Sequence, residues 1–125
     1  MEKTSVIVLA TRMKVLLQKR KELLQTVEAL IQRTRKQNGC ISCHFYQDIE
    51  NENAFNLVEE WKTQVDLDNH LGSDHFGVLL GAMNLLSEPT EIKFNAVSHT
   101  GGMKTLKAAR ELNANNPNYR KEEKR

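Results

Sequence analysis

The order of hydrophobic and polar residues predicts strands at residues 5–12, 40–47, 54–62 and 91–98. In the first stretch both odd- and even-numbered positions are apolar and often β-branched, which is typical of a strand covered on both faces. The second and third alternate, so successive side chains would point to opposite faces. One face would carry Ile41, Cys43 and Phe45, and the other Ser42, His44 and Tyr46.

Between the first two strands, leucines, Val27 and Ile31 recur at spacings of three and four, which predicts a helix. We expect it to end near Asn38-Gly39, where both residues tolerate a left-handed cap. A shorter helix at residues 64–71 is broken at Gly72. Ser73 would cap the helix after it, and Pro89 would end that helix.

This order, βαββαβ, is the ferredoxin-like pattern of α+β proteins, with two helices on one face of a four-stranded antiparallel sheet. The other face would be bare but partly apolar, because residues 5–12 are apolar at both parities. The third strand would add either Phe55, Leu57 and Trp61 or Val58 to that face. An exposed apolar face marks an interface or a pocket. We therefore expect a homodimer in which a second copy covers this face, closes an α+β barrel and encloses a cavity.

Length and composition fit one globular domain at residues 1–98 with an extension at 99–125. The longest apolar runs, at residues 6–10 and 78–83, fall short of the roughly 20 residues that span a bilayer. The N-terminal residues do not resemble a signal peptide, and two cysteines are few for a small secreted domain. These features favour a cytoplasmic protein that does not bind membranes.

Charge is distributed unevenly along the chain. Residues 1–102 carry 11 basic and 13 acidic side chains, whereas residues 103–125 carry 7 and 3. The body is therefore mildly acidic, which argues against a nucleic-acid-binding domain. Residues 103–112 could form a short helix, and residues 119–125 are expected to be flexible. This basic tail would either contact an acidic partner or remain solvated.

Four stretches together resemble the antibiotic biosynthesis monooxygenase family over residues 4–98: Gly39-Cys40-Ile41, Phe45-Tyr46-Gln47-Asp48, Glu59-Glu60-Trp61 and the segment from His70 to Phe76. The resemblance implies a homodimer that oxidises a small quinol, phenol or enol with molecular oxygen, without a metal or flavin cofactor. The ligand would be a small apolar or aromatic metabolite held in a cavity. A dimer that binds such a metabolite without catalysis, or an isomerase-type relative, is the alternative.

This sequence differs from relatives of the family at two places, and both differences bear on the expected reaction. Haem-cleaving relatives place an axial histidine late in the second helical segment and an asparagine on the first strand. This chain has Val78, Leu79 and Leu80 in that part of the helix and no asparagine in the strand, so haem degradation is disfavoured. Cys43 stands where relatives often carry a tyrosine.

The candidate catalytic residues are His70, Trp61 and His44. Histidine exchanges protons near neutral pH, so His70 could act as a base at the cavity mouth or simply end a short helix. Trp61 could stack on a planar substrate or pack in a core or dimer interface. His44 shares a face with Ser42 and Tyr46, and polar residues pack poorly against helices. We therefore expect this face to line the cavity, the alternative being an edge position open to solvent.

The candidate substrate-binding residues are Tyr46, His75, Phe76 and Asn95. His75 could act as a base or hydrogen-bond donor at the cavity mouth, or satisfy backbone groups in the first turn of its helix. Asn95 could donate to a substrate oxygen or lie at a sheet edge. No third ligand stands at a spacing diagnostic of a metal site with the histidines.

Two further pairs of residues, one of cysteines and one of glutamates, could carry chemistry. Cys40 and Cys43 form a Cys-x-x-Cys motif, but strand parity would send their side chains to opposite faces, which favours two small buried residues over a redox pair. Glu59 and Glu60 alternate, so one of them points inward. That carboxylate could act as a base, or be held in a hydrogen bond or ion pair.

Overall fold

The computed structural model describes residues 6–118, and the elements in this range follow the predicted order. Residues 119–125, predicted to be flexible, lie outside the described range. The strands are β1 (Ile7–Lys14), β2 (Cys40–Asp48), β3 (Asn51–Trp61) and β4 (Glu91–Ala96). The helices are α1 (Arg20–Thr34), α2 (Gln64–Leu71), α3 (Asp74–Ala82) and α4 (Met103–Ala114), with 3₁₀ turns η1 (Leu17–Lys19) and η2 (Met83–Leu85).

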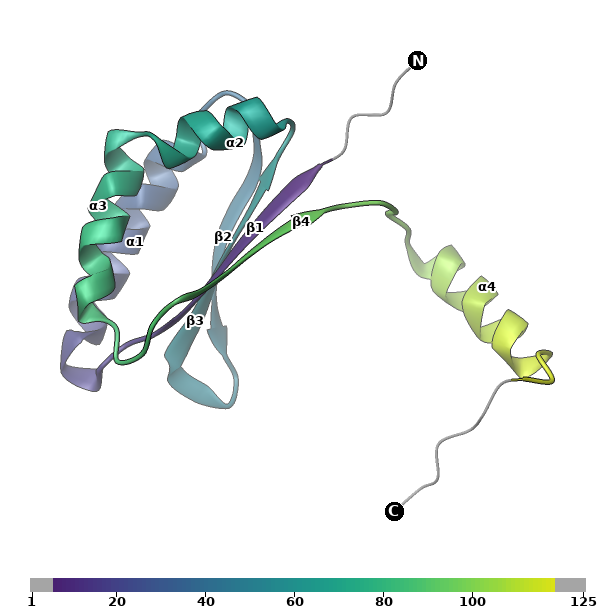
Figure 1. Cartoon of the computed structure of the whole chain (residues 1–125). Coiled ribbons are helices and arrows are strands. Elements are labelled where there is room, and N and C mark those ends of the chain that lie inside the picture. Colours follow the sequence, from purple (N-terminus) through teal and green to yellow (C-terminus); the bar gives the residue numbers. More distant parts are fainter. Residues whose placement is uncertain (1–5, 119–125) are drawn as a thin grey trace.

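The strands form one antiparallel sheet in the order β2-β3-β1-β4. Figure 1 shows α1 and α3 together on one side of this sheet, with α2 across its upper end. The predicted α+β ferredoxin-like fold is therefore confirmed. No helix within residues 6–118 is long and apolar enough to cross a membrane.

Strand register decides which side chains face the helices. On β1, Leu9, Thr11 and Met13 are buried, and they pair with Glu59, Leu57 and Phe55 of β3. The sequence allowed either face of β3 to be the bare one. In the structure Phe55, Leu57 and Trp61 lie under the helices, and Val58 lies on the bare face. The helices close this core with Leu23, Val27, Leu30, Phe76 and Leu79.

The prediction that α1 ends near Asn38 is wrong. The helix ends at Thr34, and a turn follows in which Gln37 donates its backbone N–H to Thr34 O and accepts one from Cys40. Gly39 then adopts φ +82°, the left-handed region that glycine tolerates. A Cβ at Gly39 would also collide with the Asp66 side chain, so this turn requires glycine.

The prediction that Cys40 and Cys43 point to opposite faces is also wrong. Cys40 pairs with Trp61, but Ser42 pairs with Glu60, so Ile41 is an extra residue in a β-bulge. The bulge shifts the parity by one, and both cysteines face the helices while Ile41 is exposed. Burial raises the pKa of both thiols, that of Cys43 to about 12. Both are therefore neutral packing groups rather than reactive thiolates.

Candidate functional site

The corner between α2 and α3 places the histidines. Thr63 caps α2 by accepting the backbone N–H of Asp66, and Ser73 caps α3 by accepting that of Phe76. The Ser73 hydroxyl also donates to the carbonyl oxygen of His70 at 2.6 Å, which ties the end of α2 to the start of α3. The predicted cap at Ser73 is thus present, and it sets His70 facing inward.

His70 lies beneath the helices against a buried carboxylate. Both His70 and Glu59 have no exposed side-chain surface, and His70 Nε2 lies 2.8 Å from Glu59 Oε1. That distance suits an ion pair, although the contact lacks the angular geometry of a hydrogen bond. Trp61 Nε1 donates to the same oxygen at 3.1 Å, and its ring stacks on His70 at 4.7 Å between centroids. Glu59 Oε2 is buried without a partner among the described residues.

Gln37 links His70 to His75. Its side-chain oxygen Oε1 lies 2.6 Å from His70 Nδ1 and 2.9 Å from His75 Nε2. An amide oxygen can only accept, so in this orientation both ring nitrogens donate. The proton of neutral His75 then sits on Nε2, which leaves Nδ1 with a free lone pair.

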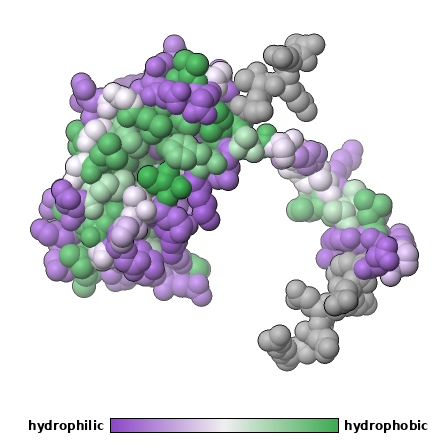
Figure 2. Space-filling view, viewed as in Figure 1, coloured by the Kyte–Doolittle hydropathy of each residue, from purple (hydrophilic) through white to green (hydrophobic). Residues whose placement is uncertain are grey.

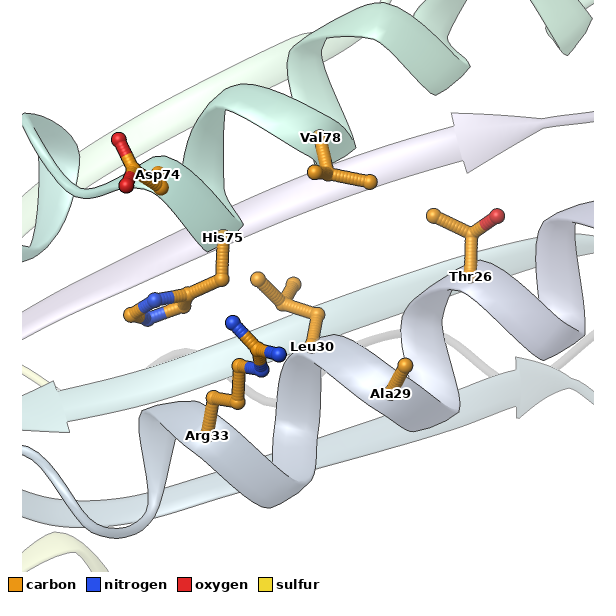
Figure 3. A pocket seen from close by; sticks show the side chains of 7 residues that line it. All are labelled: Thr26, Ala29, Leu30, Arg33, Asp74, His75 and Val78. Carbon is orange, nitrogen blue, oxygen red and sulfur yellow. The ribbon is translucent and has the colours of Figure 1, made fainter.

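His75 also lines a groove of about 260 Å³ between α1 and α3. Leu30, Ala29 and Val78 make its apolar walls, and Arg33 brings a positive charge. Figure 3 shows the His75 ring and the Arg33 guanidinium both extending into the space between α1 and α3, while the Asp74 carboxylate points away from it. Arg33 takes part in none of the ion pairs found within residues 6–118. The groove therefore combines an apolar wall, a cation and an imidazole.

Electrostatics keep His75 neutral. Burial lowers its pKa below the usual 6.5, and the neighbouring His70 and Arg33 lower it further. Glu59 and Asp74 oppose this shift with smaller effects. At neutral pH His75 is thus an unprotonated acceptor next to a guanidinium.

The bare face of the sheet carries a second hollow, of about 310 Å³. Ser42 donates to Glu60 Oε1 at 2.6 Å, and the His44 and Tyr46 rings lie 6.1 Å apart. His44 Nδ1 lies 3.3 Å from the Arg35 guanidinium, which occupies it as an acceptor. The hollow is completed by Val8 and Val58.

The sheet divides the predicted site residues into two groups. Trp61, His70, His75 and Phe76 lie together on the helical side, where the Phe76 ring meets His70 edge-on at 5.1 Å. His44 and Tyr46 lie in the hollow on the other face. Asn95 pairs with Val8 and so shares that face, but it does not line the hollow.

Two members of the helical-side cluster were not predicted. Gln37 follows α1 in a turn and touches histidines 33 and 38 residues away, which local pattern cannot indicate. Arg33 lies one turn beyond Leu30, next to the apolar stripe of α1. This position in the sequence could have indicated a cation beside an apolar surface. Within residues 6–118, no group of three or more His, Cys, Asp or Glu side chains is placed to hold a metal ion.

Comparison with known proteins gives a consistent result. A family model described as antibiotic biosynthesis monooxygenase matches residues 6–79, more than half of the chain. An uncharacterized protein of Synechocystis is 33% identical over 95 residues, which cover 75% of this chain and 65% of that protein. The chain thus spans slightly less than two thirds of that relative. YcnE of Bacillus subtilis, provisionally named a monooxygenase, is 31% identical over 87 residues, covering 69% of this chain and 92% of YcnE.

Solved structures share the fold. A conserved protein from Methanosarcina mazei superposes with a TM-score of 0.70 at 32% identity, covering 74% of this chain and 92% of that one. Rv0793 from Mycobacterium tuberculosis superposes with a TM-score of 0.72 at 24% identity, covering 78% and 100%. The second likeness concerns the fold alone.

Proposed function

The chain belongs to the antibiotic biosynthesis monooxygenase family, and from that membership we propose that it oxidises a small quinol, phenol or enol with molecular oxygen and no metal or flavin. Such a substrate becomes electron-rich enough to reduce oxygen once its hydroxyl proton is lost. At an activated CH₂ carbon, one oxygen atom would replace two hydrogens and the other would leave as water. The protein must then accept a proton, stabilise an anion and limit water.

His75 is the proton acceptor in this proposal. Its Nδ1 carries the free lone pair, because Nε2 donates to Gln37, and its lowered pKa keeps the ring neutral. A substrate hydroxyl in the α1–α3 groove could donate to that nitrogen. The Arg33 guanidinium, on the same groove, would stabilise the anion that forms. Leu30 and Val78 would hold the apolar part of the substrate.

The Glu59–His70 pair orients this acceptor. His70 Nε2 lies against Glu59 Oε1 at 2.8 Å and His70 Nδ1 against Gln37 Oε1 at 2.6 Å, so the ring bridges the buried carboxylate and the amide. His70 Nδ1 then holds Gln37 Oε1, which in turn fixes His75 Nε2. The observation that carries the proposal is this unbroken chain of contacts from a fully buried carboxylate to a solvent-facing groove. Glu59, His70 and Gln37 are positioning residues in this scheme.

A homodimer belongs to the proposal as well. Val8, Val58 and Tyr46 give the bare face apolar surface, and a second copy stacked on it would enclose the hollow beside His44. That enclosed hollow is the second candidate location for the substrate. It offers the Ser42–Glu60 hydrogen bond and two aromatic rings, but its histidine already accepts from Arg35.

Oxygen uptake by metal-free protein tests the proposal, measured against a panel of quinols, phenols and enols. We expect uptake that depends on protein and falls at least about tenfold in the Glu59→Gln/His70→Gln variant. That double change leaves no unpaired buried charge, so it should fold. Saturable binding of a panel compound without oxygen uptake would instead support a metabolite-binding dimer. Unchanged uptake in the double variant would remove the positioning role.

A further inference from the structure

Helix α4 is amphipathic, and its apolar side is not buried against any other part of residues 6–118. All of its residues are exposed, including Met103, Leu106 and Leu112, which with Ala109 repeat every three residues. Lys104, Lys107 and Glu111 lie on the opposite side of the helix. An isolated helix of 12 residues is marginal in water, so α4 requires a surface to pack against.

A matching apolar surface is exposed on the body. Ile92 and Phe94 of β4 pair with Thr11 and Leu9, so they lie on the helical side of the sheet. They are 41% and 58% exposed because α1 and α3 leave this edge strand uncovered, and Leu80 of α3 is 51% exposed. Figure 2 shows hydrophobic residues gathered between α3 and β4. We name Leu80, Ile92 and Phe94 the α3–β4 surface.

The position of α4 indicates which copy it meets. Figure 1 shows α4 on the opposite side of the sheet from α1 and α3, beyond the end of β4. That side is the bare face, where the proposed second copy would stack. The Gly101 backbone lies so close to the Thr105 side chain that an added Cβ would clash with it, so glycine suits this entry to the helix.

Residues 98–114, which comprise the linker after Val97 and helix α4, are called the arm. The arm is long enough to reach the far side of the partner's sheet. Five residues separate Val97, which still bonds to Val6, from Met103, and they reach up to about 17 Å. The 12 residues of α4 add roughly 18 Å. Stacked sheets lie about 10 Å apart, so the arm can pass the edge of the partner sheet to its helical side.

From this placement we propose that α4 of each protomer packs its apolar side on the α3–β4 surface of a second copy, a reciprocal exchange in a two-fold dimer. This inference rests on the dimer of the proposed function. Phe94 is paired with Leu9, and Leu9 packs with Trp61. The partner's arm would therefore cover the part of the core that lies beside His70. Each subunit would then complete the surroundings of the other's Trp61–His70 cluster.

Cross-linking of mixed isotopes tests the exchange in the full-length protein. Unlabelled and ¹⁵N-labelled chains are unfolded together, refolded and treated with an amine cross-linker, which can join Lys104 or Lys107 to Lys93 or Lys14. Exchange predicts that about half of these cross-links join a light and a heavy peptide, as random pairing of equal amounts requires. Cross-links within single chains only would overturn the exchange and leave the dimer standing.

Dimer affinity supplies the second readout, by sedimentation. The Leu106→Gln/Leu112→Gln variant should raise the dimer Kd about tenfold or more, because each leucine loses apolar burial. Lys104→Gln/Glu111→Gln is the matched control: it makes two changes to glutamine on the other side of α4 and preserves net charge. Equal Kd values for the two variants would overturn the exchange. A wild-type monomer at all concentrations would overturn exchange and dimer together, whereas failure of oxygen uptake alone would affect only the reaction.

Discussion

His75 connects the buried cluster around His70 with the groove between α1 and α3. Its Nε2 contacts Gln37, its Nδ1 has no hydrogen-bond partner within residues 6–118, and its ring lies between the buried His70 cluster and the α1–α3 groove. Its environment disfavours protonation, first through burial and then through His70 and Arg33. A neutral imidazole can accept a proton at neutral pH, whereas an imidazolium cannot.

The lowered pKa of His75 makes the folded state sensitive to acid. Below the reference pKa of 6.5 the unfolded chain binds a proton that folded His75 resists, so the free energy of unfolding decreases as pH falls. His75→Asn removes the titrating ring and keeps an amide that can hydrogen-bond Gln37. In urea unfolding from about pH 7.5 to 5, wild type should lose stability relative to His75→Asn. A stability difference that stays constant across this range would contradict the lowered pKa.

Single elements were predicted where local pattern decides them. The leucine repeat predicted helix α1, and Ser73 was predicted to cap α3. The structure confirms both, because residue spacing and cap chemistry are local properties of the sequence. The end of α1 and the bulge at Ile41 were not predicted. After Thr34 the chain forms a turn in which Gln37 contacts His70 and His75, and the pairing with β3 makes Ile41 the extra residue. Both features involve residues far along the chain, which local pattern does not indicate.

Glycine substitutions test this account of the elements. Gly39→Ala should cost about 1 kcal/mol or more, because it adds strain at φ +82° and a clash with Asp66. Gly77→Ala is the control within α3, where an added Cβ meets no atom within 4 Å. It should stabilise the protein by roughly 0.5–1 kcal/mol through helix propensity. Equal changes in urea midpoint for both would refute the role given to the Gly39 turn.

At the scale of the whole molecule, the sheet separates two candidate sites. The strand alternation of the sequence predicted which residues of β2 share a face, and the structure agrees for His44 and Tyr46. Alternation alone does not say which face the helices cover: the polar residues of β2 indicated the bare face correctly, whereas for β3 both faces stayed open. The covered face is set by burial of Leu9, Leu57 and Trp61, and it parts His44 from His70.

Oxygen uptake by two single variants compares these sites directly, with the substrate that the panel identifies. We expect His75→Ala to lower turnover about 100-fold or more, in keeping with loss of a general base. His44→Ala, which removes a histidine from the opposite face, should stay within about threefold of wild type, since its Nδ1 already accepts from Arg35. Loss of turnover in His44→Ala together with wild-type rates in His75→Ala would contradict the account and move the chemistry to the bare face.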